Sequence, residues 1–108
     1  MNIVFMGTPD YAEIILKELI KKYNVVAVYT QPDKPVGRKK VLTPPPVKVL
    51  AQKHNIQVFQ PQNLKNESNN IKKLNPDFIV VAAFGMILPK DILDIAPCIN
   101  LQDRKSVV

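Results

Sequence analysis

The chain has 108 residues, 46% of them apolar, with a formal net charge of +6 and a sequence pI near 9.6. This length suits one domain with a modest core. A single cysteine, Cys98, excludes an internal disulfide framework and is typical of a reducing compartment. No apolar run reaches the roughly 18 residues of a membrane span, and no basic segment precedes the first apolar run as in a signal peptide. We therefore expect a cytoplasmic protein without a membrane partner.

The first segments alternate between strand and helix. Residues 3–6 are a continuous apolar run ending at Gly7, which predicts a strand covered on both faces. Residues 8–10 then predict a helix start with Thr8 as its N-cap. Apolar residues follow at helical spacing: Ala12, Ile15, Leu16, Leu19 and Ile20. A second strand is predicted over 25–29. The strand-to-helix turn holds one glycine rather than three, which argues against a dinucleotide site for NAD or FAD.

A long basic loop follows the second strand. Residues 31–48 contain five prolines, one anion (Asp33) and five cations: Lys34, Arg38, Lys39, Lys40 and Lys48. The prolines exclude a helix or a central strand through this loop, which is longer than the usual connection of about 2–6 residues. Its stiffness and charge predict a polyanion partner, with nucleic acid first, and Arg38 suits a bidentate phosphate contact. From the loop alone, nucleic-acid contact and a merely solvated loop have about equal support.

The second half continues the alternation of strands and helices. We predict a helix over 47–54, a strand over 57–59, a polar turn-rich segment over 61–68, a helix over 67–74, a central strand over 78–84, one or two helical turns within 89–95, and a strand over 98–101. Such alternation predicts an α/β fold with a parallel sheet and right-handed crossovers. No internal repeat and no Gly- or Ser-rich linker divides the chain.

The segment after the predicted central strand is a candidate binding site. It consists of Phe84, Gly85, Met86, Ile87, Leu88 and Pro89. Ligands of open α/β sheets bind just outside the carboxyl ends of the strands. Gly85 permits an unusual backbone turn, and the apolar residues after it can line a slot for a flat ring. From these residues alone, ordinary packing at the strand exit is favoured over a ligand site.

Three single residues have alternatives of their own. His54, the only histidine, has no Asp, Cys or Glu at metal-ligand spacing, so we predict a surface helix cap and no metal site. Cys98 is predicted to be a small core residue rather than a nucleophile. Asn100 falls near the same sheet edge as the candidate site. A buried Asn there can hold a carbonyl or an oxyanion through its amide, although a lone Asn is more often a strand-end residue.

Nine short segments form a pattern in a fixed order along the chain. They are residues 3–10, 30–35, 37–38, 46–51, 59–61, 75–77, 80–85, 87–90 and 98–101. Together they resemble the methionyl-tRNA formyltransferase family from residue 1 to about residue 101. The Pro-Asp-Lys-Pro run at 32–35 distinguishes that family from the purine-pathway formyltransferases that share its fold.

The resemblance implies a Rossmann-like formyltransferase fold and an enzyme of translation initiation. Such an enzyme transfers a formyl group from 10-formyltetrahydrofolate to the amino group of methionine on initiator tRNA. The resemblance further implies that the tRNA is contacted by Lys34, Arg38, Lys39 and Lys40, and that the folate is held by residues 84–89. Asn100 falls on the first residue of the family's catalytic Asn-Leu-His triplet, where its amide would stabilise the tetrahedral intermediate. We expect a monomer when the protein is full length.

Two alternatives to this function remain open. The first is a sugar-nucleotide formyltransferase of the same fold, which would use a different acceptor for the formyl group. The second is a non-catalytic fragment that binds tRNA through the basic loop alone.

The end of the chain departs from the family pattern. Gln102 stands where the family has its histidine, and a glutamine amide cannot serve as a general acid or base near neutral pH. The family's later aspartate and its C-terminal tRNA-binding domain are absent. We therefore interpret residues 1–101 as the N-terminal, truncated parallel-sheet part of a formyltransferase catalytic domain, inactive by itself. Its apolar sheet edge predicts aggregation or a molten state.

Residues 102–108 are interpreted as a non-native tail. The run from Asp103 to Val108 with a stop can be encoded by GATCGGAAGAGCGTCGTGTAG, a common sequencing-adapter string. Read-through into this string would also convert a histidine codon at position 102 into one for glutamine.

Overall fold

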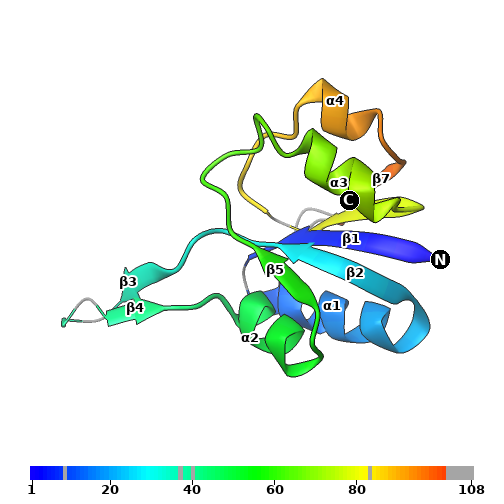
Figure 1. Ribbon diagram of the computed structural model, residues 1–108. Coiled ribbons are helices and arrows are strands. Elements are labelled where there is room, and N and C mark those ends of the chain that lie inside the picture. The colour runs from blue at the N-terminus through cyan, green and yellow to red at the C-terminus, as the bar shows by residue number, and fades with distance from the viewer. Residues whose placement is uncertain (9, 37, 40, 83, 102–108) are drawn as a thin grey trace, which may run out of the picture.

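The computed structural model describes residues 1–8, 10–36, 38–39, 41–82 and 84–101. Its centre is a parallel sheet in the order β5-β2-β1-β6-β7. The strands are β1 (Asn2–Gly7), β2 (Asn24–Tyr29), β5 (Gln57–Phe59), β6 (Phe78–Ala82) and β7 (Cys98–Leu101). Figure 1 shows helices on both faces of this sheet. The predicted α/β class and parallel sheet are therefore confirmed.

The described helices lie close to the predicted positions. They are α1 (Asp10–Lys22), α2 (Pro46–Lys53), α3 (Ser68–Leu74) and α4 (Lys90–Leu93). Helices α1 and α2 cover one face of the sheet, and α3 and α4 lie on the other (Figure 1). The strand predicted over 78–84 is described as β6 over Phe78–Ala82, and Phe84 lies outside it. None of the helices in the described ranges is long and apolar enough to cross a membrane.

The core has two layers, one on each face of the sheet. Along β1, Val4 and Met6 pack toward α3 and α4, whereas Ile3 and Phe5 pack toward α1 and α2. All four are 3% exposed or less, so the prediction of a strand covered on both faces is confirmed. The predicted apolar face of α1 is also confirmed: Ala12 and Leu16 are fully buried, and Ile15, Leu19 and Ile20 pack partly against the core.

Gly7 permits the close approach of helix and sheet at the end of β1. A Cβ atom at this position would lie 2.9 Å from the side chains of Ala12 and Phe5 and from the carbonyl oxygen of Ala82. Any larger residue would push α1 away from the sheet edge, where the candidate site begins.

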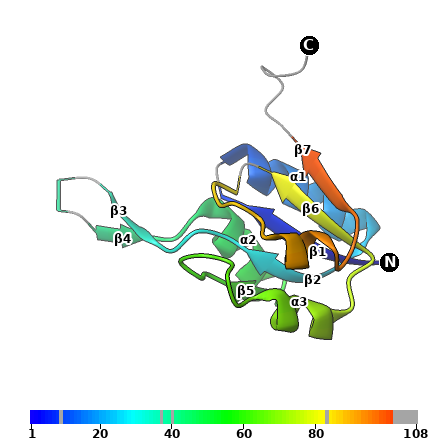
Figure 2. The same cartoon turned by 90° about the horizontal axis from the view of Figure 1, so that it is seen from above.

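The basic loop contains a hairpin that the sequence analysis did not predict. Strands β3 (Lys34–Val36) and β4 (Val41–Thr43) pair antiparallel and form what we call the arm, residues 34–43. Figure 2 shows the arm projecting away from the sheet. The prolines do exclude a central strand, but Pro35 is tolerated in this isolated two-stranded ribbon. The sequence did contain one signal for this hairpin. A short connection with a glycine separates two β-branched residues, Val36 and Val41.

One part of the sheet is less well covered than the rest. Beside β7, on the α1 side, an apolar groove of about 400 Å³ is lined by Met1, Ile3, Leu19, Tyr23, Phe78, Val80, Ile99 and Leu101. Tyr23 and Ile99 are each 43% exposed, and β7 is the edge strand of the described sheet. An exposed apolar surface of this kind is where we expect self-association of the chain, so aggregation stays a prediction.

Candidate functional site

Several strands end at one edge of the sheet, and the residues after them face each other. Thr8 follows β1, Gln60 follows β5, and Gln31 lies two residues beyond β2. Phe84 lies two residues beyond β6 at the same edge. Figures 1 and 2 show the base of the arm and the segment after β6 leaving the sheet there. Because the carboxyl ends of parallel strands are the usual ligand-binding edge, this edge is the candidate functional site.

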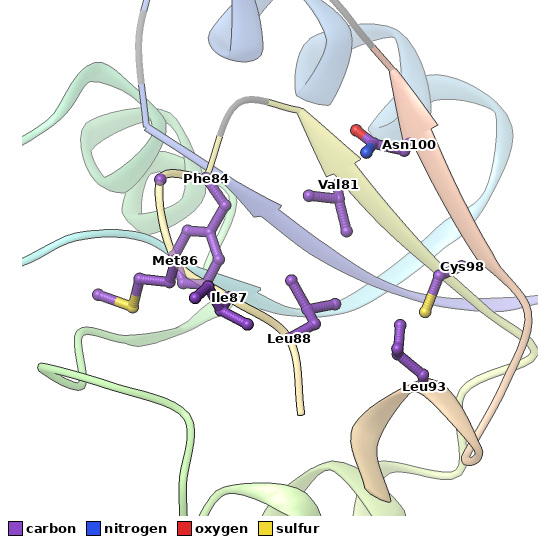
Figure 3. Close-up of a pocket in the computed structure, with 9 residues that line it drawn as sticks. Val81, Phe84, Met86, Ile87, Leu88, Leu93, Cys98 and Asn100 are labelled. Atoms are coloured by element: carbon purple, nitrogen blue, oxygen red, sulfur yellow. The ribbon is translucent and has the colours of Figure 1, made fainter. Parts of the chain in front are cut away.

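Residues 84–89, which we call the turn, line an apolar cavity of about 680 Å³. The lining residues are Val81, Phe84, Gly85, Met86, Ile87, Leu88, Leu93, Cys98 and Asn100 (Figure 3). Phe84 is buried, whereas Ile87 is 91% exposed. The structure thus brings five of the six turn residues together around one cavity, while folate binding by them stays a prediction.

The sixth turn residue, Pro89, lines a second cavity on the same turn. This cavity has a volume of about 560 Å³ and is also lined by Gln62, Asn63, Leu64, Lys65, Gly85, Met86 and Ile87. From the sequence, residues 62–65 were predicted only to belong to the polar, turn-rich segment 61–68. Their position beside the turn depends on long-range packing, so no local signal could have indicated it.

Gly85 adopts the unusual backbone conformation that the sequence predicted. Its φ angle is +83°, a region that other residues enter only with strain. A Cβ atom here would also collide with Nε2 of Gln31. The turn therefore requires glycine both for its backbone and for contact with the segment that leads to the arm.

Asn100 and Cys98 lie on β7 and line the first cavity. Asn100 lies on β7 opposite Val81 and lines the first cavity, but its side chain is exposed and not buried. Cys98 lines the cavity and is only half-buried, although it packs against the core. Burial raises the pKa of its thiol, which disfavours the nucleophilic thiolate.

The cations of the basic loop fall into two groups. Arg38 and Lys39 are exposed between the two strands of the arm. Lys48 instead lies on α2, where its Nζ is 3.2 Å from the Oδ1 of Asp33. Its charge is thus paired with the loop's one anion, so the loop's net +4 comes from the four cations Lys34, Arg38, Lys39 and Lys40. The side chain of Lys34, all of Lys40 and also Gln102 lie outside the described residues.

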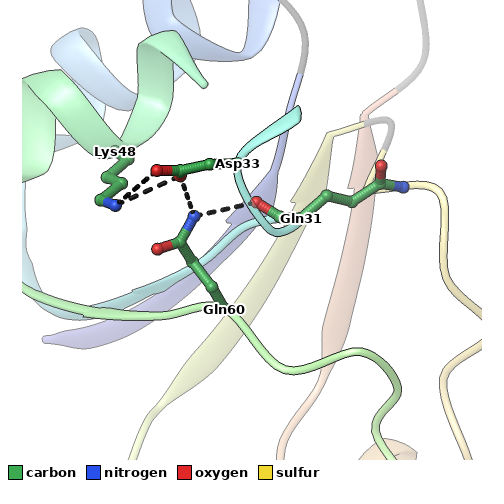
Figure 4. A network of polar contacts seen from close by, with 4 residues as sticks. All are labelled: Gln31, Asp33, Lys48 and Gln60. Carbon is green, nitrogen blue, oxygen red and sulfur yellow. Dashed lines mark hydrogen bonds and ion pairs between the residues drawn. The ribbon is translucent and has the colours of Figure 1, made fainter. Parts of the chain in front are cut away.

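A polar network holds the base of the arm (Figure 4). Gln60 Nε2 donates to Asp33 Oδ1 at 2.7 Å and to the carbonyl oxygen of Gln31 at 3.1 Å. The bond from Gln60, together with Lys48, holds the pKa of Asp33 below its ordinary value. Gln31 and Gln60 were not predicted as site residues, although each follows a strand at the ligand-binding edge and lies in a segment of the family pattern.

Two further predictions concern the surroundings of the site. His54 is exposed at the C-cap of α2, so its predicted role as a surface cap is confirmed. The Thr8 hydroxyl, predicted to cap α1, donates to the carbonyl oxygen of Phe84 at 3.3 Å and accepts from Gln31 N–H at 3.4 Å. Within the described ranges, no group of three or more His, Cys, Asp or Glu side chains is placed to hold a metal ion.

The chain matches the formyl transferase family over residues 1–102. It is 68% identical to the methionyl-tRNA formyltransferase of Campylobacter fetus subsp. fetus over 106 residues, covering 93% of this chain and 35% of that protein. The corresponding proteins of Campylobacter lari and Clostridium perfringens are 65% and 58% identical, covering 93% and 94% of this chain and 35% and 34% of theirs. The chain thus spans about a third of the length of the curated relatives it matches. The resemblance seen in the sequence is confirmed, and the chain belongs to the formyl transferase family.

Proposed function

We propose that this chain supplies the N-terminal part of the catalytic domain of a methionyl-tRNA formyltransferase. The complete enzyme transfers a formyl group from 10-formyltetrahydrofolate to the amino group of methionyl initiator tRNA. The observation that carries this proposal is the placement of the basic arm and the apolar cavity at one sheet edge, where Gln31 Nε2 donates to the carbonyl oxygen of Phe84 at 3.0 Å. The names and identities of the curated relatives support it.

The turn supplies the donor site in this proposal. A folate carries a flat ring system, and the cavity beside residues 84–89 offers apolar walls for it. Asn100 at the same cavity can donate its amide N–H to the oxyanion that forms when the amine attacks the formyl carbon. The donor binds as a substrate, and no metal takes part.

The arm supplies the acceptor site. Arg38 and Lys39 are exposed between the strands of the arm, and Lys34 and Lys40 flank them in sequence. Guanidinium and ammonium groups on a projecting ribbon suit contacts to the phosphates of the tRNA acceptor end. We expect the complete protein to act in the cytoplasm, as a monomer, without a membrane partner.

The 108-residue chain by itself is expected to be inactive. It spans about a third of its relatives, and Gln102 stands where the family has its histidine. The glutamine amide cannot transfer a proton near neutral pH, so the amine attack would lack its acid–base group.

A chimera tests the proposal. Residues 1–101 would replace the matching segment of the Campylobacter fetus relative, which is 68% identical. We expect this chimera to formylate methionyl initiator tRNA from 10-formyltetrahydrofolate and to leave an amino-sugar nucleotide unmodified. The unaltered relative is the positive control, and the 108-residue chain is expected to show no transfer.

Two results would contradict the proposal. Formylation of the sugar nucleotide in preference to the tRNA would assign the chain to the sugar-nucleotide formyltransferases. A folded chimera that binds tRNA without transferring the formyl group would instead favour a tRNA-binding role for these residues.

A further inference from the structure

A continuous series of polar contacts runs from helix α2 to the turn. Lys48 Nζ donates to both carboxylate oxygens of Asp33, at 3.2 and 3.3 Å. Gln60 Nε2 joins Asp33 to the carbonyl oxygen of Gln31 (Figure 4). Gln31 Nε2 in turn donates to the carbonyl oxygen of Phe84 at 3.0 Å. The series therefore connects the base of the arm to the first residue of the turn.

The contacts of Asp33 close the base of the arm. Asp33 directly precedes β3, and Lys48 follows β4 by five residues, so their ion pair joins the two chain segments that flank the arm. The side chains of Lys48 and Asp33 are 20% and 29% exposed, so water screens this pair only in part. Because β3 and β4, the described strands of the arm, pair only with each other and form a separate sheet, the direction of the arm depends strongly on contacts at its base.

Gln31 connects the network at the base of the arm with the turn. Its carbonyl oxygen accepts from Gln60, and its side chain donates to Phe84. Its Nε2 also occupies the space where a Cβ of Gly85 would lie. The side chain thus determines where the turn begins relative to the segment that leads into the arm.

The chemistry at this point requires a neutral donor of this length. The carbonyl oxygen of Phe84 also accepts from Thr8 at 3.3 Å, so it faces two donors. A carboxylate in place of the Gln31 amide would place its oxygen beside the Phe84 carbonyl oxygen, and two acceptors cannot form a hydrogen bond with each other. A shorter or apolar side chain would leave the Phe84 carbonyl without its donor from the arm side.

We propose that Gln31 is a positioning residue, which sets the arm at a fixed distance and direction from the turn. This inference rests on the proposed function, in which the arm holds the tRNA end and the turn holds the formyl donor. The rate of transfer between two bound substrates falls steeply when their reacting groups are misplaced. A misplacement of about 1 Å can lower the rate about 100-fold. Gln31 therefore contributes to the rate of transfer without contacting either substrate.

The test compares Gln31→Glu with Gln57→Glu in the chimera. Gln57 is exposed on β5, so its substitution makes the same change of charge away from the network. We expect Gln31→Glu to lower kcat by about ten-fold, while tRNA affinity in a gel shift and KM for the donor change by less than about three-fold. The control is expected to stay within about two-fold of the parent.

A double-mutant cycle with Arg38→Ala separates positioning from simple loss of structure. Residues without a shared contact normally have additive effects. If Gln31 orients the arm, the loss caused by Arg38→Ala in kcat/KM for tRNA should shrink by about three-fold or more in the Gln31→Glu background. A substitution that merely lowers the folded fraction would reduce every activity equally and leave the cycle additive.

Gln31→Met keeps the test decisive if Gln31→Glu does not fold. Methionine retains the length of the side chain without donating a hydrogen bond, and the cycle with Arg38→Ala is expected to show the same coupling. An active chimera with additive effects in a folded variant would overturn the positioning role and leave the proposed function intact. An unsubstituted chimera that folds but transfers no formyl group to tRNA would overturn both.

Discussion

The arm and the turn begin at the same sheet edge but differ in exposure and packing. The arm projects from the molecule, carries Arg38 and Lys39 exposed, and is held mainly at its base. The turn folds against the sheet with Phe84 buried and Gly85 in a left-handed conformation. Charge acts over several ångströms and needs little packing, whereas recognition of a flat ring needs a close wall. Under the proposed function, recognition by charge and recognition by shape would thus be separated within one edge.

The largest effect is expected from Gly85→Ala, which disrupts the turn directly. The substitution forces a Cβ into a backbone with φ of +83° and against Gln31. We expect a loss of about 1–3 kcal/mol in the free energy of unfolding and a rise of about ten-fold or more in KM for the donor. Urea unfolding and steady-state kinetics of the chimera measure the two effects.

The Gln31 contact can be separated from the backbone strain. Shortening Gln31 to Ala in the Gly85→Ala background should recover part of the lost stability, because the collision disappears while φ stays positive. An unchanged donor KM in Gly85→Ala would contradict the assignment of the turn to the donor.

Arg38→Ala is expected to have the next largest effect, on the arm alone. For a single phosphate contact, the salt dependence of tRNA binding should decrease by about one unit of slope. Gel shifts over a range of salt concentrations measure it. Lys17→Ala, which removes an exposed cation of α1, is the matched control and should leave the slope unchanged. Equal slopes for the parent and Arg38→Ala would refute the contact.

Ile87→Ala should have a smaller effect, on the turn alone. Ile87 is 91% exposed and lines both cavities, so it loses few contacts in the free protein. We expect KM for the donor to rise about three-fold, because less apolar surface is buried on binding. The free energy of unfolding should change by less than about 0.5 kcal/mol.

A matched control for Ile87→Ala is Ile14→Ala. Ile14 is 65% exposed on α1, and its truncation should change neither stability nor donor KM. If both substitutions raise donor KM equally, the turn has no special part in donor binding.

The smallest effect concerns the pH dependence at the base of the arm. Gln60 and Lys48 hold the pKa of Asp33 below its ordinary value of 3.8. Stability from this carboxylate is therefore present above pH 3.8 and is lost as the pH falls through the lower pKa of the folded state. We expect Asp33→Asn to unfold at lower urea than the parent near neutral pH, with the difference shrinking below pH 3.8. A difference that stays constant over this range would refute the role of the charge, and Asp94→Asn at the end of α4 is the control.

The sequence was sufficient for the fold because the signals for it are local. Apolar runs such as 78–82 and the helical spacing over 12–20 each lie within one element, and their alternation implies a parallel sheet. The hairpin of the arm was not predicted, because the prolines of the loop argued against strands and the sequence signal for a hairpin was short. The sequence left two interpretations of Asn100 open, a buried polar residue and a strand-end residue, and its exposure near the end of β7 fits the second.

The connection between the arm and the turn could not be predicted from the sequence. The bond from Gln31 to Phe84 joins residues 53 apart in the chain, and the bond from Gln60 to Asp33 joins residues 27 apart. Both residues lie in segments of the family pattern, 30–35 and 59–61, but those segments assign neither glutamine a chemical role, and glutamine is common on surfaces. Only the packing of β2, β5 and β6 at one edge brings these side chains together.

The most direct test of the division between charge and shape is a salt titration of the chimera's kinetics with both substrates. We expect Arg38→Ala to weaken the salt dependence of kcat/KM for tRNA while leaving donor KM unchanged. Ile87→Ala should raise donor KM at every salt concentration and leave the tRNA slope as in the parent. If each substitution alters the parameters of both substrates alike, the arm and the turn do not divide recognition between them and this account is wrong.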